Sequence, residues 1–195
     1  MDGFIEKLKK REKQSIREVM AFMSYNPSIG RVLEKESVKV FQDMAVRKSD
    51  ELRKIRTRED FDGFHEEWVH EFVRKIKTNK NQRCSYGQAQ KAINVFLKLL
   101  VDWASRPDRN TAIKLRPFLH VPLDKILMKK IKEQYPYFYK EKIGPLQKHN
   151  SAFSLSRVDK RTYGRWQDFF RKKCPRKPLL FDIAWAIHRR ETHGK

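Results

Sequence analysis

The segment 86–104 most constrains the fold, because its apolar residues cover most of the circumference of a helix. At about 100° per residue, no wide polar face is left over on this segment. The apolar positions are Ala89, Ala92, Ile93, Phe96, Leu97, Leu99, Leu100, Trp103 and Ala104. A helix that is apolar on most sides is buried on most sides. The sequence therefore predicts a central helix around which the rest of the chain packs.

Other segments repeat apolar residues at the spacing of amphipathic helices. They are 2–25, 31–56, 61–76, 122–134, 157–173 and 178–190. No segment has a sustained period of two, which would indicate strands. We expect an all-α fold, a compact bundle of about seven helices around helix 86–104.

Local signals set several boundaries. Thr57, followed three residues later by Asp60, and Ser85, followed by Gln88, have the pattern of helix N-terminal capping boxes. Arg106 begins a stretch without clear periodicity that continues to Pro122, and Pro122 suits the first turn of the next helix. A Gly-Pro sequence opens the best linker candidate, 144–154. We expect a helical core domain at 1–143 with a basic helical pair at 151–195 packed on it, or one domain over 1–195.

A large positive charge points to a polyanionic partner. The chain of 195 residues has 45 Lys and Arg against 24 Asp and Glu, a formal net charge of +21. Such an excess destabilises the compact state through self-repulsion, and a dense polyanion relieves it. No apolar run reaches the roughly 18 residues that span a bilayer. We therefore expect a cytoplasmic protein that binds nucleic acid, DNA or RNA, without membrane association.

The predicted helix 157–173 is the strongest candidate for phosphate contacts. Its cations lie opposite the predicted inward face of Tyr163, Trp166 and Phe170, and Asp168 is the only acid among them. Arginine suits bidentate phosphate contacts better than lysine does. The predicted contacts here are Arg157, Lys160, Arg161, Arg165, Lys172, Arg176 and Lys177. Lys125 and Lys129, in the predicted helix 122–134, are further candidates.

The polar residues of helix 86–104 form one strip, for which two interpretations remain open. The strip is either a narrow solvent-exposed face or one wall of a groove, with Gln90, Lys91 and Asn94 facing His120 and Asp124. In a groove, Asn94 could contact bases or sugars, and Lys91 and Lys98 could contact phosphates.

The segment Tyr86-Gly87-Gln88-Ala89-Gln90-Lys91-Ala92-Ile93-Asn94 and the turn Leu119-His120-Val121-Pro122-Leu123-Asp124 resemble segments of prokaryotic helical proteins with no assigned activity. The two segments cover about a tenth of the chain. The resemblance implies that the strip and the His-x-Pro-x-Asp turn belong to one site, and it implies no reaction.

Most sequence patterns that would indicate an enzyme are absent. His65 and His70 are five residues apart, about 140° around a helix, so they cannot share a metal as a His-Glu-x-x-His pair does. No phosphate-binding glycine loop is present, and neither cysteine, Cys84 or Cys174, lies in a C-x-x-C spacing. We expect two reduced thiols, no cofactor and no metal.

One catalytic pattern survives. Arg58 and His65 have a spacing that resembles the Arg-x4–6-His motif of HEPN ribonucleases, which are also helical. In that family the arginine and the histidine act on the scissile phosphate. Glu59 follows the arginine here, where the family has other residue types. His120 is the other candidate for a metal-independent nuclease.

The sequence favours a nucleic-acid-binding protein over an enzyme, with contacts to the phosphate backbone and little direct readout of bases. Such a protein could be a basic subunit of a nucleoprotein complex, together with protein subunits. The alternatives are a HEPN-like or other metal-independent nuclease, and an interaction module for an acidic protein partner.

Overall fold

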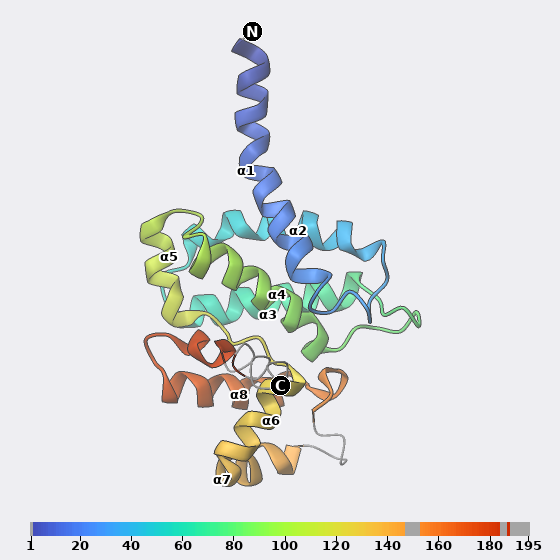
Figure 1. The fold of residues 1–195 in the computed structure, drawn as a ribbon, viewed down its shortest axis with the longest axis vertical. Helices are drawn as coiled ribbons and strands as arrows, with labels where there is room; N and C mark the ends of the chain where they lie inside the picture. Colours follow the sequence, from blue (N-terminus) through green and yellow to red (C-terminus); the bar gives the residue numbers. More distant parts are fainter. Residues whose placement is uncertain (1, 147–152, 184–186, 188–195) are drawn as a thin grey trace.

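The all-α expectation is confirmed. The structure, a computed structural model, describes residues 2–146, 153–183 and 187. Within these residues the secondary structure is helical apart from two isolated β-bridges (Figure 1). The α-helices are α1 (Asp2–Tyr25), α2 (Ser37–Glu51), α3 (Arg58–Lys75), α4 (Tyr86–Leu97), α5 (Arg109–Leu115), α6 (Lys125–Gln134), α7 (Pro136–Phe138) and α8 (Lys160–Lys173). Short 3-10 and π-helical turns join several of them.

Helix α4 contacts α1, α3, α8 and the 3-10 turn Leu155–Arg157. It continues into a π-helical turn, Lys98–Trp103, so the apolar segment runs to Trp103 as a single helical element. Ser85 caps the start of α4: its hydroxyl accepts from Gln88 N at 3.1 Å, and its own N–H donates to Gln88 Oε1 at 2.8 Å. Nearly every residue of α4 is buried, as a helix apolar on most sides requires.

The buried apolar residues form two clusters. One gathers residues of α1 to α5, with Phe41, Trp68 and Phe96 fully buried inside it. The other joins the chain from Val121 to Ile143 with α8, and Trp166 is fully buried there. Tyr86 and Leu155 pack against both clusters. The second cluster contains residues from both sides of the linker expected at 144–154.

The segment between α1 and α2 differs from the sequence expectation, which began the second helix at residue 31. The chain at Leu33 instead pairs with Thr78, and Glu34 N donates to Lys77 O at 3.1 Å. The hydroxyl of Tyr25 also donates to Glu34 O at 3.1 Å. These contacts hold the backbone away from helical geometry, so α2 begins at Ser37.

The stretch 106–122, expected to be irregular, contains α5. Asp108 caps this helix, because its carboxylate accepts from Thr111 N at 2.9 Å. Pro122 lies outside α6 rather than in its first turn, since Asp124 is the cap of that helix. Asp159 caps α8, which therefore begins at Lys160. The last expected helix, 178–190, is a 3-10 helix over Pro178–Asp182, and most of its remainder lies outside the described residues.

Gly87 marks the closest approach between two elements. Its N–H donates to Val158 O at 2.9 Å, and a Cβ at this position would lie 2.3 Å from Leu155 O and 2.6 Å from Val158 Cβ. A methyl group cannot fit there, so the start of α4 would have to separate from the segment 155–158.

We predict that Gly87→Ala lowers the free energy of unfolding by about 1–3 kcal/mol, because it overpacks this contact. Gly63→Ala is the matched control. A Cβ at Gly63, inside α3, meets nothing within 4 Å. Removing a helical glycine there should stabilise the protein by about 0.5–1 kcal/mol. Urea denaturation measures both changes, and equal effects of the two variants would contradict the close approach.

Candidate functional site

Helix α8 has one buried face and one basic face. Trp166 and Phe170 are fully buried, and Tyr163 is 3% exposed. Asp159 fixes the start of the helix by accepting from Thr162 N at 2.7 Å. The aromatic face therefore anchors α8, and the side chains opposite it are held outward.

The exposed cations on and beside α8 form a surface that we name the α8 basic edge. It comprises Arg157, Arg161, Arg165, Lys172 and Arg176, all exposed. None of them forms an ion pair with an acid in the part of the chain that the structure describes. From Arg161 to Lys172 the edge extends about 16 Å along the helix.

Two of the predicted phosphate contacts are neutralised within the fold. The Lys160 ammonium lies 2.5 Å from Glu66 Oε1 and the Lys177 ammonium 3.4 Å from Asp102 Oδ1. Both side chains remain about half exposed or more, so either can exchange its partner for a phosphate. Lys125 and Lys129 are exposed on α6, away from the α8 basic edge in sequence.

The polar strip of α4 is mostly buried rather than a solvent-exposed face. Its Lys91 and Lys98 line a cavity of about 360 Å³ together with Asp124 and Asp182. Gln90 and Asn94 face the turn 119–124 and are covered by it. Asn94 is 1% exposed, so the structure does not present it to a base or a sugar. The Lys91 ammonium lies 3.1 Å from Asp124 Oδ2, and that of Lys98 lies 2.6 Å from Asp182 Oδ2. Both lysines are mostly buried and already paired, so a phosphate contact, which stays a prediction, would require each to exchange its carboxylate partner.

A buried polar network lies where the strip, the turn and α8 meet. Its members come from four parts of the chain that are distant in sequence. They are Asp62 and His65 of α3, Gln90 and Asn94 of α4, His120 of the turn, and Tyr163, Gln167 and Arg171 of α8.

At one end of the network, Asp62 joins His120 to Arg171. Arg171 Nη1 donates to Asp62 Oδ2 at 2.9 Å, and Nη2 donates to Oδ1. His120 Nε2 lies 2.8 Å from the same Oδ1 and 2.6 Å from Arg171 Nη2. A carboxylate can only accept, so we assign the His120 proton to Nε2. His120 Nδ1 is then an acceptor.

The other end of the network follows from that assignment. The Tyr163 hydroxyl donates to His120 Nδ1 at 2.7 Å and accepts from Asn94 Nδ2 at 2.8 Å. His65 Nε2 donates to Asn94 Oδ1 at 2.7 Å. The second amide hydrogen of Asn94 reaches Gln90 Oε1 at 2.9 Å. The hydrogens of the Tyr163 hydroxyl, of the Asn94 amide and on Nε2 of the two histidines therefore each have an acceptor, as burial demands.

Gln167 attaches the turn to α8. Its Oε1 accepts from Val121 N at 2.9 Å, and its Nε2 donates to Val121 O at 2.9 Å. Gln90 makes a longer contact, 3.4 Å, with Leu123 N. The irregular backbone of the turn is thus satisfied by side chains instead of by secondary structure.

Burial sets the charge states of the network. It lowers the pKa of His65 well below the usual value, helped by the neighbouring His120. Burial also lowers the pKa of His120, and the hydrogen bond to Asp62 offsets only part of this effect. The pKa of the Tyr163 hydroxyl is raised well above its usual value by burial. Burial alone would raise the pKa of Asp62, but hydrogen bonds from His120 and Arg171 outweigh it and hold that pKa far below its usual range.

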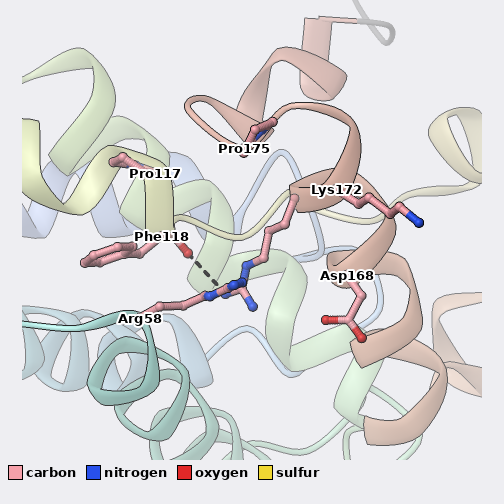
Figure 2. A pocket seen from close by; sticks show the side chains of 7 residues that line it. Arg58, Pro117, Phe118, Asp168, Lys172 and Pro175 are labelled. Carbon is pink, nitrogen blue, oxygen red and sulfur yellow. Dashed lines mark hydrogen bonds between the residues drawn. The ribbon is translucent and has the colours of Figure 1, made fainter.

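A cavity of about 470 Å³ opens beside the network (Figure 2). The residues that line it are Arg58, Pro117, Phe118, Asp168, Arg171, Lys172 and Pro175. Arg58, the first residue of α3, extends towards the centre of the cavity, whereas Lys172 and Asp168 project from α8 (Figure 2). His65 and His120 are not among the lining residues. Of the expected pair Arg58 and His65, only the arginine faces this space.

The other candidate groups for catalysis are unsuited to it. Burial raises the pKa of the Cys84 thiol to about 12, so it stays protonated and a weak nucleophile at neutral pH. Cys84 and Cys174 are both free thiols. The described residues contain no group of three or more His, Cys, Asp and Glu side chains that could hold a metal ion.

Sequence reasoning missed Asp62, Gln167 and the inward role of Arg171. Asp62 lies in a charged helix start, and nothing local to it indicates a partner at residue 120 or 171. The spacing of Tyr163, Gln167 and Arg171, each four residues after the last, does place them on one stripe of α8. That shared stripe was the one sequence signal that could have indicated that Gln167 and Arg171 face inward with Tyr163.

Comparisons with protein families, with curated proteins and with solved structures found no match to this chain. In the part of the chain that the structure describes, no helix combines the length and the apolar character needed to cross a bilayer.

We predict that the free energy of unfolding falls as the pH is lowered from 7 to 5. Unfolded histidine binds a proton near pH 6.5, whereas the folded state keeps His65 and His120 neutral to lower pH. The unfolded state therefore binds more protons, and stability decreases by up to about 1.4 kcal/mol per pH unit for each histidine. Urea denaturation at constant ionic strength measures the slope. His70→Gln, which removes an exposed imidazole, should preserve the slope, and a stability that is flat over this range would contradict the neutral histidines.

We predict that Tyr163→Phe lowers the free energy of unfolding by about 1–3 kcal/mol, because His120 Nδ1 loses its donor and one amide hydrogen of Asn94 loses its acceptor. Tyr137→Phe is the control, since Tyr137 is 77% exposed. It should change stability by less than about 0.5 kcal/mol. If the two variants are equally stable, the hydroxyl of Tyr163 does not have the proposed role.

Proposed function

We propose that the protein binds nucleic acid through phosphate contacts along the α8 basic edge. One observation carries the proposal: the exposed cations of this edge have no acidic partner among the described residues, and they project from a helix that is anchored by buried aromatic residues. Side chains held on a rigid element lose little freedom when a ligand binds.

Several cations on other helices are already paired with acids, unlike those of the α8 basic edge. Lys48, Lys91 and Lys98 are mostly buried and paired with carboxylates. Arg47 and Lys75 share Glu71. Asp168 lines one depression together with Arg161 and Arg165, without forming an ion pair with a described residue. A phosphate backbone placed there would replace repulsion between cations with attraction.

The contacts of this surface are to phosphates rather than to bases. Asn94 and Gln90, the side chains best suited to read base edges, are buried in the polar network. Binding is therefore expected to be nearly independent of sequence and strongly dependent on salt. For six to ten phosphate contacts, affinity should fall by about 10³–10⁵ between 50 and 200 mM salt.

The test is the salt dependence of oligonucleotide binding, measured by fluorescence anisotropy. Replacing Arg161, Arg165 and Lys172 by Ala should reduce the slope of log K against log salt by about three, if each residue contacts one phosphate. A control variant with Lys35, Lys80 and Lys114 replaced by Ala removes the same charge from exposed sites on other elements. It should keep most of the slope.

Two outcomes would overturn the proposal. If wild-type protein binds neither DNA nor RNA at low salt, the cations serve another partner, such as an acidic protein. If both triple variants lower the slope equally, the effect is one of net charge and the α8 basic edge is not the contact surface. Paired assays with single-stranded and duplex oligonucleotides of DNA and RNA would identify the type of nucleic acid.

A further inference from the structure

We infer that the cavity between the start of α3, Pro117–Phe118 and the end of α8 binds the phosphorylated terminal nucleotide of a nucleic-acid strand. The inference rests on the proposed function and adds a site to it. The cavity of about 470 Å³ is large enough to hold one small ligand.

The lining has the two chemical characters that a nucleotide needs. Arg58, Arg171 and Lys172 supply cations, and Pro117, Phe118 and Pro175 supply an apolar wall (Figure 2). A nucleotide presents an anionic phosphate and a flat base whose faces pack on apolar and aromatic groups. An inorganic anion would use the first group of residues and leave the second unused.

The two arginines have different roles. Arg171 is fixed by its double contact with Asp62, and its Nη2 also reaches Phe118 O at 3.4 Å. Its charge is mostly compensated, so it shapes the cavity more than it attracts a ligand. Arg58 is exposed and has no ion pair with any described residue. Arg58 is therefore the residue that determines affinity for the phosphate.

The position of the cavity indicates the end of a strand rather than its interior. Asp168 lines both this cavity and a shallow depression formed by Lys160, Arg161, Gly164 and Arg165. The cavity and this depression on the α8 basic edge therefore lie on either side of Asp168. On its other sides the cavity meets the first residue of α3 and the turn at Pro117. A strand that follows α8 would reach this wall and stop.

Asp168 allows a sharper test, because it is the only acid among the described residues that line the cavity. Its carboxylate is exposed, has no ion pair with a described residue, and repels a phosphate. Asp168→Asn should therefore strengthen binding of a phosphorylated end, whereas Arg58→Ala should weaken it. Opposite effects from two exposed residues are not expected from damage to the fold.

The experiment measures the affinity of the full chain for three otherwise identical single strands by anisotropy. One strand carries a 5′-phosphate, one a 3′-phosphate, and one a hydroxyl at both ends. We expect one phosphorylated strand to bind at least fivefold tighter than the hydroxyl strand. Arg58→Ala should abolish this preference, so that the phosphorylated and hydroxyl strands bind equally, and Asp168→Asn should increase the preference about threefold. Lys114→Ala, which removes an exposed cation on α5, is the control and should change neither quantity.

Calorimetry with AMP, ribose 5-phosphate and adenosine tests the cavity without a strand. We expect AMP to bind more tightly than the other two, and Arg58→Ala to lose AMP binding. Equal affinity for the three strands would overturn the inference and leave backbone binding intact. If no strand binds, the proposed function fails, and the AMP titration alone decides whether the cavity is a nucleotide site. Absence of AMP binding would then overturn the inference as well.

Discussion

The hydrogen bond between Asp62 and His120, closed by Arg171, is the interaction on which the arrangement of this protein depends. It begins a buried polar network between the two apolar clusters. Hydrophobic contact alone is non-directional and would let the second cluster settle against the first in several ways. Hydrogen bonds in the network are directional, and a different placement of α8 would leave buried donors and acceptors such as Tyr163 and Asn94 unpaired at a cost in free energy. The network therefore fixes the register of α8 against α3, α4 and the turn at His120.

That register decides which cations of α8 can act on a partner. The stripe of Tyr163, Gln167 and Arg171 faces the network, so the guanidinium of Arg171 is paired with the carboxylate of Asp62. Arg161, Arg165 and Lys172 face outward as a consequence, with no acid paired to them in the described part of the chain. The fold thus pairs the inward cations Lys91, Lys98 and Arg171 with carboxylates and leaves the cations of the α8 basic edge facing outward. Close-range repulsion along this edge is the cost that a bound polyanion would remove.

The sequence predicts the local features of this fold well. The apolar circumference of α4, its capping box at Ser85 and the cap at Thr57 all depend on residues within a few positions of each other. The fold departs from expectation where distant residues decide. Leu33 and Glu34 leave the helical path because of partners at Thr78 and Lys77. The same division holds for the candidate site. The exposed cations of α8 follow from helical spacing. The partners of Lys91, Lys98 and Asp62 do not, because they are 33 to 109 residues away in the sequence. No periodicity indicates such pairs.

The most direct test is amide chemical-shift mapping of the folded protein with a short oligonucleotide at low salt. The account predicts that shifts concentrate at 157–172 and at the start of α3 near Arg58, with the buried amides of Val121 and Leu123 unmoved. Shifts that cluster instead on α6 at Lys125 and Lys129, or an absence of shifts anywhere, would contradict it.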